Sequence, residues 1–87
     1  MTGDKSKAPS PTQIFTEYLR RTRRRRTPER YMVLECAETC QGHFTAEELC
    51  VRLEEASRHV ARATVYSTLQ LLEECGIVMR HRFKDQR

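Results

Sequence analysis

The stretch ARATVYSTLQLLEECGIV, residues 61–78, decides the fold. Placed on a helical wheel at about 100° per residue, it separates into two arcs, one for each face of a helix. One arc is mainly apolar and holds Val65, Thr68, Leu69, Leu72 and Cys75. The other is polar and holds Arg62, Tyr66, Gln70 and Glu73. Because Gly76 is a typical residue to end a helix, the pattern predicts a helix over 62–75 with one buried face.

Two helices are predicted before residue 40. The first follows Pro11 and runs for about ten residues, with Thr12 as the expected cap and an apolar face of Ile14, Phe15, Tyr18 and Leu19. The second begins with Thr27 as cap and Pro28 at the first helical position. It is expected to end between residues 39 and 42, and its apolar stripe contains Tyr31, Val33, Leu34, Cys36 and Ala37.

The third helix has the clearest start signal in the chain. Thr45 and Glu48 have the spacing of a capping box, in which each side chain accepts a hydrogen bond from the backbone amide of the other. Phe44 and Leu49 have the spacing of the apolar staple that accompanies such a start. We therefore expect a helix over 45–56 that buries Ala46, Leu49, Cys50 and Leu53.

The segment after Gly76 has the composition of a strand. Residues 77–83 read IVMRHRF, and a hairpin turn is expected over 84–86. Since an unpaired strand is not stable alone, further residues are expected beyond Arg87. About four helices followed by a strand or short hairpin indicate a mainly α winged helix-turn-helix, in which one helix lies in the DNA major groove. The alternative for residues 62–75 is an amphipathic helix with a solvated polar face.

Length and composition allow one small domain. The chain has 87 residues, of which 32% are charged. We expect a disordered tail over the small and polar residues 1–11 and one folded domain over 12–87. No stretch approaches the ~20 apolar residues of a membrane span, and the first thirty residues lack the apolar centre of a signal peptide. The sequence thus predicts a cytoplasmic protein with no membrane partner.

Basic charge is concentrated near the N-terminus. Residues 1–31 carry nine basic and three acidic side chains, a net charge of +6, whereas residues 32–87 carry seven basic and nine acidic ones, a net charge of −2. The run RRTRRRR at 20–26 is a candidate phosphate-binding patch, because each arginine that neutralises a phosphate releases condensed counterions. A solvated, disordered basic arm is the alternative for the same run.

The cysteine pattern argues against a domain stabilised by disulfides or zinc, and the lack of catalytic motifs argues against an enzyme. Cys36, Cys40, Cys50 and Cys75 are expected to be thiols at core or boundary positions, since cytosolic thiols stay reduced. Cys36 and Cys40 could share a helix face as two metal ligands, but tetrahedral zinc takes four. The sequence has neither a Gly-rich phosphate loop nor a His and Cys pair with nucleophile spacing, so we expect no enzyme activity.

Four motifs together resemble the DNA-binding domain of the ferric uptake regulator family: TPERYMVLE at 27–35, HFTAEEL at 43–49, ATVYSTLQLLEECGIV at 63–78 and RHRF at 80–83. The resemblance covers residues 12–87. It implies a bacterial, metal-responsive transcriptional repressor that binds palindromic double-stranded operators as a homodimer. It also implies a C-terminal dimerisation and metal-sensing domain that these 87 residues lack. Without it, we expect this chain to be a monomer or weak dimer.

The resemblance assigns DNA-binding roles to individual residues. Tyr66 matches a tyrosine that contacts a base in the major groove, and Thr64 is placed to meet a phosphate. Ser67 stands where the family commonly has arginine, and serine discriminates bases poorly. Basic residues at the end of the family's first helix match Arg20 and Arg21. The remaining members of the predicted DNA-binding set are Arg23, Arg24, Arg25, Arg26 and Arg62.

His43 matches a histidine that supplies one ligand of the family's regulatory metal site. A divalent ion such as Fe, Zn or Mn needs further ligands, which the resemblance places in the C-terminal domain. We therefore expect a half-site at His43 and no cofactor held by this chain alone. The alternative to DNA binding is a protein- or RNA-interaction module that uses the winged helix and the arginine-rich segment.

Overall fold

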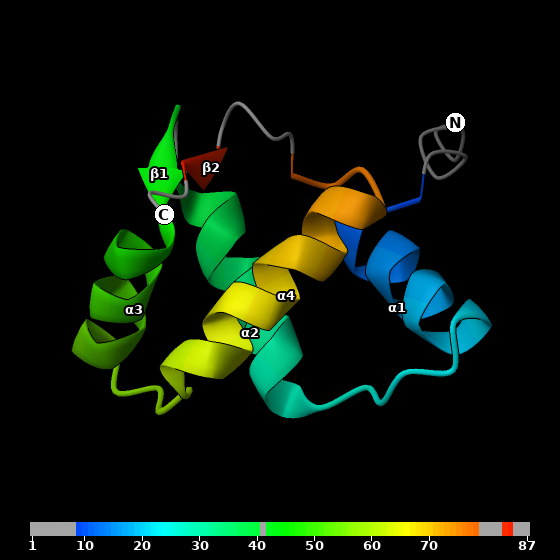
Figure 1. Cartoon of the computed structure of the whole chain (residues 1–87), viewed down its shortest axis with the longest axis horizontal. Helices are drawn as coiled ribbons and strands as arrows, with labels where there is room; N and C mark the ends of the chain where they lie inside the picture. Colours follow the sequence, from blue (N-terminus) through cyan, green and yellow to red (C-terminus); the bar gives the residue numbers. More distant parts are fainter. Residues whose placement is uncertain (1–8, 41, 79–82, 85–87) are drawn as a thin grey trace, which may run out of the picture.

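The computed structural model describes residues 9–40 and 42–78 and the backbone of residues 83 and 84. Within these ranges the chain forms four helices and two short strands (Figure 1). In chain order they are α1 (Pro11–Arg21), α2 (Pro28–Thr39), β1 (Phe44–Thr45), α3 (Ala46–Glu55), α4 (Arg62–Glu74) and β2 (Phe83–Lys84). The mainly α class is confirmed, and the order of the elements is consistent with a winged helix-turn-helix.

Helices α2, α3 and α4 form the centre of the fold. Each packs against the other two, and α4 crosses in front of α2 in the view of Figure 1. The predicted apolar faces supply the core, which contains Val33, Leu34, Ala37, Leu49, Leu53, Val65, Leu69 and Leu72. Leu71 is also buried, so the apolar face of α4 is wider than the wheel predicts. Because each fully buried Val or Leu contributes about 1.5–3 kcal/mol, this core holds α4 firmly with its polar face outward.

Helix α1 is anchored to α2. Phe15 and Leu19 are fully buried, and the Phe15 ring meets the Tyr31 ring edge-on at 5.6 Å between centroids. The hydroxyls of Thr16 and Tyr31 are hydrogen-bonded at 2.7 Å. These contacts define where the basic end of α1 lies relative to the core.

The helix starts agree with the sequence prediction except at α1. In the α3 capping box, the amide of Glu48 donates to Oγ1 of Thr45 and the amide of Thr45 donates to Oε1 of Glu48, each at 3.0 Å. Thr27 caps α2 as predicted. The prediction that Thr12 caps α1 is wrong, because Pro11 occupies the first helical position and Ser10 is therefore the cap. Ser10 and Pro11 thus belong to the folded part, whereas residues 1–8 of the expected tail lie outside the described residues.

The strand prediction requires a correction. Gly76 ends α4 with a φ of +85°, and the next two residues form a bend rather than a strand. Strand β2 includes Lys84, which was expected in a turn, and it pairs in parallel with β1, with Phe44 opposite Phe83. A two-residue strand has no readable period, so its partner could not be found from the sequence. Residues 79–82 and 85–87, which include the predicted hairpin turn, lie outside the described part of the chain.

Candidate nucleic-acid interface

The predicted DNA-contacting residues of α4 lie on its first two turns. Arg62 and Ser67 are exposed, and Thr64 and Tyr66 are half-buried. The helix begins after Ala61 with neither a side-chain cap hydrogen bond nor an acidic residue in its first turn. Since the start of a helix carries partial positive charge, this end of α4 is suited to an anionic partner.

Glu47 of α3 contacts two of these residues. Its carboxylate forms an ion pair with Arg62, and the Tyr66 hydroxyl donates to the same oxygen, Oε2, at 3.4 Å. The hydrogen bond to Glu47 raises the pKa of the Arg62 guanidinium above its ordinary value. The two charged side chains are 59% and 60% exposed, so a partner can reach both. Sequence reasoning missed Glu47, because the contact depends on how α3 packs on α4.

Six exposed arginines lie at the end of α1 and in the loop that follows: Arg20, Arg21, Arg23, Arg24, Arg25 and Arg26. Nη2 of Arg20 is 2.7 Å from Oε2 of Glu17, and this hydrogen bond lowers the pKa of the Glu17 carboxyl. The Arg21 guanidinium lies over the Tyr18 ring, 5.7 Å from its centroid. Even where they have local partners, these side chains remain accessible.

The backbone of this loop is held by local hydrogen bonds. Arg23 has a φ of +61°, and its amide donates to the carbonyl of Arg20 at 3.1 Å. The amide of Arg24 donates to the carbonyl of Leu19 at 2.8 Å, which completes a Schellman turn at the end of α1. Nη1 of Arg30 donates to the carbonyl of Arg25 at 2.6 Å. Residues 19–24 therefore form a hydrogen-bonded turn at the end of α1, and the Arg25 carbonyl is held by Arg30.

Figure 1 shows how the basic loop and α4 are arranged. The loop between α1 and α2 and the start of α4 both lie along the lower edge of the molecule in this view, whereas β1 and β2 lie at the upper left. The basic loop and the polar end of α4 are therefore on one side of the fold in this view.

His43 lies just before β1 and is exposed. It lines a surface hollow together with Cys40, Glu47 and Glu48. Among residues 9–40 and 42–78, no three His, Cys, Asp or Glu side chains come close enough together to hold a metal ion.

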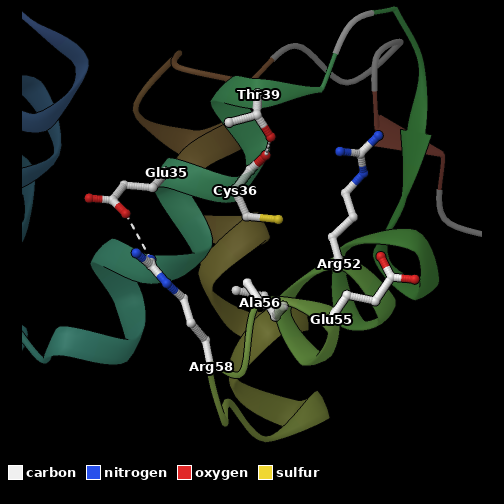
Figure 2. A pocket seen from close by; sticks show the side chains of 8 residues that line it. Glu35, Cys36, Thr39, Arg52, Glu55, Ala56 and Arg58 are labelled. Carbon is white, nitrogen blue, oxygen red and sulfur yellow. Dashed lines mark hydrogen bonds and ion pairs between the residues drawn. The ribbon is translucent and has the colours of Figure 1, made fainter.

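The cysteines occupy core and boundary positions, as predicted. Cys40 is buried, and the other three are half-buried, including Cys50, which was expected on the buried face of the third helix. Figure 2 shows Cys36 in a hollow of about 420 Å³ between α2 and α3, beside the ion pair of Arg58 with Glu35 at 2.7 Å. Burial raises the pKa of the Cys36, Cys50 and Cys75 thiols. A raised thiol pKa lowers the fraction of thiolate at neutral pH.

In the part of the chain that the structure describes, no helix is both long and apolar enough to cross a membrane.

The fold and the polar, basic side of the molecule define a winged-helix domain suited to nucleic acid. Comparison with known proteins specifies the family. The model of the ferric uptake regulator family matches residues 21–87, and the chain belongs to this family. Members of this family are DNA-binding transcription regulators rather than enzymes, and in general they bind divalent metal ions.

Three relatives illustrate the similarity. The ferric uptake regulation protein of Rhizobium leguminosarum bv. viciae is 35% identical over 63 residues, which cover 72% of this chain and 44% of the relative. That of Brucella abortus (strain 2308) is 35% identical over 69 residues, or 79% and 49% of the two chains. The peroxide operon regulator of Bacillus subtilis (strain 168) is 33% identical over 69 residues, or 79% and 48%. The chain thus spans about half the length of these relatives. No solved structure gives a significant match.

Proposed function

We propose that this chain is the sequence-specific DNA-binding domain of a metal-responsive transcriptional repressor, and that it binds double-stranded DNA with α4 in the major groove. The observation that carries the proposal is the presence of a polar, accessible start of α4 together with six exposed arginines at the end of α1 and in the loop that follows. α4 has 13 residues, a length of about 20 Å, and only its polar face is accessible. A helix of this size fits the major groove of B-form DNA.

The residues divide into those that read bases and those that bind phosphates. Tyr66 and Ser67 contact base edges, and Thr64 and Arg62 at the start of α4 contact the backbone. Ser67 adds little discrimination, because a hydroxyl bonds to several bases. The arginines at 20, 21 and 23–26 bind phosphates or enter the minor groove, so much of the affinity is electrostatic and falls with salt.

The whole regulator binds a palindromic operator as a homodimer, with Fe, Zn or Mn as the effector, and acts in the cytoplasm. This chain contributes the DNA-binding domain, which begins at Ser10, and one metal ligand, His43, and is a monomer or weak dimer on its own. Its DNA affinity is modest, since it lacks the avidity of two linked half-sites. Because one histidine cannot hold a divalent ion alone, the effect of metal on the DNA affinity of this chain is absent or small, and a sharp increase on adding Fe(II), Mn(II) or Zn(II) would contradict this part of the proposal.

Selection from a pool of randomised DNA duplexes tests the function. The chain is expected to enrich one class of sequence and to bind that enriched duplex more tightly than a scrambled duplex of the same composition. Tyr66→Ala should lower this preference, while Val51→Ala, which truncates an exposed apolar side chain on α3, should not. Equal binding of enriched duplex, scrambled duplex and RNA would reject a specific DNA reader and favour the RNA- or protein-interaction alternative.

A further inference from the structure

We propose that Glu47 is a specificity-determining positioning residue, which restrains Arg62 and Tyr66 and makes the domain discriminate more strongly between DNA sequences. This inference rests on the proposed function. Its starting point is geometric: one carboxylate on α3 contacts the side chains of two successive turns of α4, a guanidinium suited to phosphate and a phenol suited to base edges.

The ion pair acts against DNA binding in general. Arg62 must leave Glu47 before it can bind a phosphate, and a carboxylate beside the groove repels the DNA backbone. This penalty applies to every DNA sequence, because phosphate contacts carry no sequence information. An exposed ion pair of this kind is weak, so phosphate can displace it. Glu47 therefore lowers the affinity for any duplex by a modest factor.

The hydrogen bond to Tyr66 acts in favour of the correct sequence. The Tyr66 hydroxyl donates to Oε2 of Glu47, which restricts the rotation of the phenol in the unbound domain. A side chain already held in place loses less conformational freedom on binding. Only a sequence that Tyr66 can read gains from this preorganisation. Glu47 thus lowers the affinity for every DNA sequence, but its contact with Tyr66 restores affinity for the correct sequence alone. The difference in affinity between the correct sequence and all others therefore increases.

Glu47→Gln tests the proposal, and Glu55→Gln is the matched control. Both substitutions remove one negative charge from α3, but Glu55 lines the hollow between α2 and α3, away from the contacts to α4 (Figure 2). With the enriched and scrambled duplexes as probes, Glu47→Gln should raise the affinity for scrambled DNA about two- to fivefold and lower the ratio of the two affinities. The salt slope for scrambled DNA should steepen by at most about one, because the surface beside the groove loses one negative charge.

Repeating the Glu47→Gln change in an Arg62→Gln variant shows whether Glu47 acts through Arg62. In Arg62→Gln, the further change Glu47→Gln should raise the affinity for scrambled DNA by a smaller factor than in the wild-type chain, because only the repulsion between the carboxylate and the DNA backbone is then removed. Thermal unfolding of each variant checks that the substitutions do not change the stability of the domain. We expect equal stability, since Gln keeps the size of Glu and the capping box of Thr45 with Glu48 remains.

The same measurements distinguish failure of the role of Glu47 from failure of the proposed DNA-binding function. If the wild-type chain prefers the enriched duplex and Tyr66→Ala weakens that preference, but Glu47→Gln behaves like Glu55→Gln, the role of Glu47 is rejected and the proposed function stands. A Glu47→Gln effect of undiminished size in Arg62→Gln would also reject it. No preference in the wild-type chain would overturn the proposed function and the role of Glu47 with it.

Discussion

Tyr18 of α1 donates a hydrogen bond from its hydroxyl to the carboxylate of Glu74, the last residue of α4. The contact joins residues 56 positions apart and ties the basic end of α1 to the helix proposed to read DNA. It also raises the pKa of Tyr18, first through this hydrogen bond and then through partial burial. The relative placement of the arginine loop and α4 thus depends partly on one phenol.

Tyr18→Phe should lower the free energy of unfolding by up to about 1 kcal/mol at pH 8, because the bond is charge-assisted but exposed. Since the folded-state pKa is raised, the contribution is complete below the ordinary tyrosine pKa of about 10 and is lost as pH rises through the folded value. Urea unfolding of both proteins between pH 8 and 10.5 checks this. Identical stabilities at pH 8 would show that the contact contributes nothing.

Thr68→Val should stabilise the domain by about 1 kcal/mol. Thr68 is completely buried in α4, and its Oγ1 has no hydrogen-bond partner among the described residues. Valine keeps the shape and removes an unsatisfied hydroxyl. The reverse change Val65→Thr, one turn away and equally buried, is the control and should destabilise by about 1–3 kcal/mol. A loss of stability in Thr68→Val, measured by urea unfolding, would mean that the hydroxyl is satisfied in solution.

Among the described residues, two non-glycine residues with positive φ offer a third stability test. Arg23 and Ser57 each have a φ of +61°, at the ends of α1 and α3. Because the left-handed region costs a side chain roughly 1 kcal/mol, Arg23→Gly and Ser57→Gly should both raise the stability by up to that amount. Only Arg23→Gly should weaken DNA binding, since it removes a cation from the basic turn. Equal loss of DNA affinity in both variants would mean that loop flexibility, not charge, matters.

Replacement of Arg24, Arg25 and Arg26 by glutamine should weaken binding to enriched and scrambled duplexes by the same factor. The salt slope should fall in magnitude by up to about three, near one for each lost phosphate contact. Arg52→Gln is the control, since this arginine of α3 lines the hollow of Figure 2. Fluorescence titrations at several salt concentrations provide the measurement. A selective loss for the enriched duplex would assign base reading to this loop.

Local sequence signals explain why the helices could be predicted. The box of Thr45 with Glu48 and the pair Thr27–Pro28 act within one helical turn, and the apolar arc of α4 repeats over three turns. Each is a property of neighbouring residues. The cap of α1 was misplaced by two residues because Pro11 permits both Ser10 and Thr12 as candidates, and only the capping box with Gln13 decides between them.

Contacts between elements could not be predicted in the same way. The pairing of β1 with β2 and the contact of Glu47 with Arg62 and Tyr66 both depend on how separate elements pack. From sequence, Glu47 is merely an acidic residue in the first turn of α3. The residues of the candidate interface were found from the resemblance and from charge, whereas the carboxylate that restrains two of them required the structure.

The central claim is that the start of α4 and the arginines of residues 20–26 form the DNA-binding surface. NMR titration of the ¹⁵N-labelled chain with the enriched duplex tests it most directly, because every assigned backbone amide reports its own change. We expect the largest changes in amide chemical shift at residues 20–26 and 61–67, and only small changes around Cys36 in the hollow between α2 and α3. Changes centred on that hollow, with α4 unaffected, would contradict it.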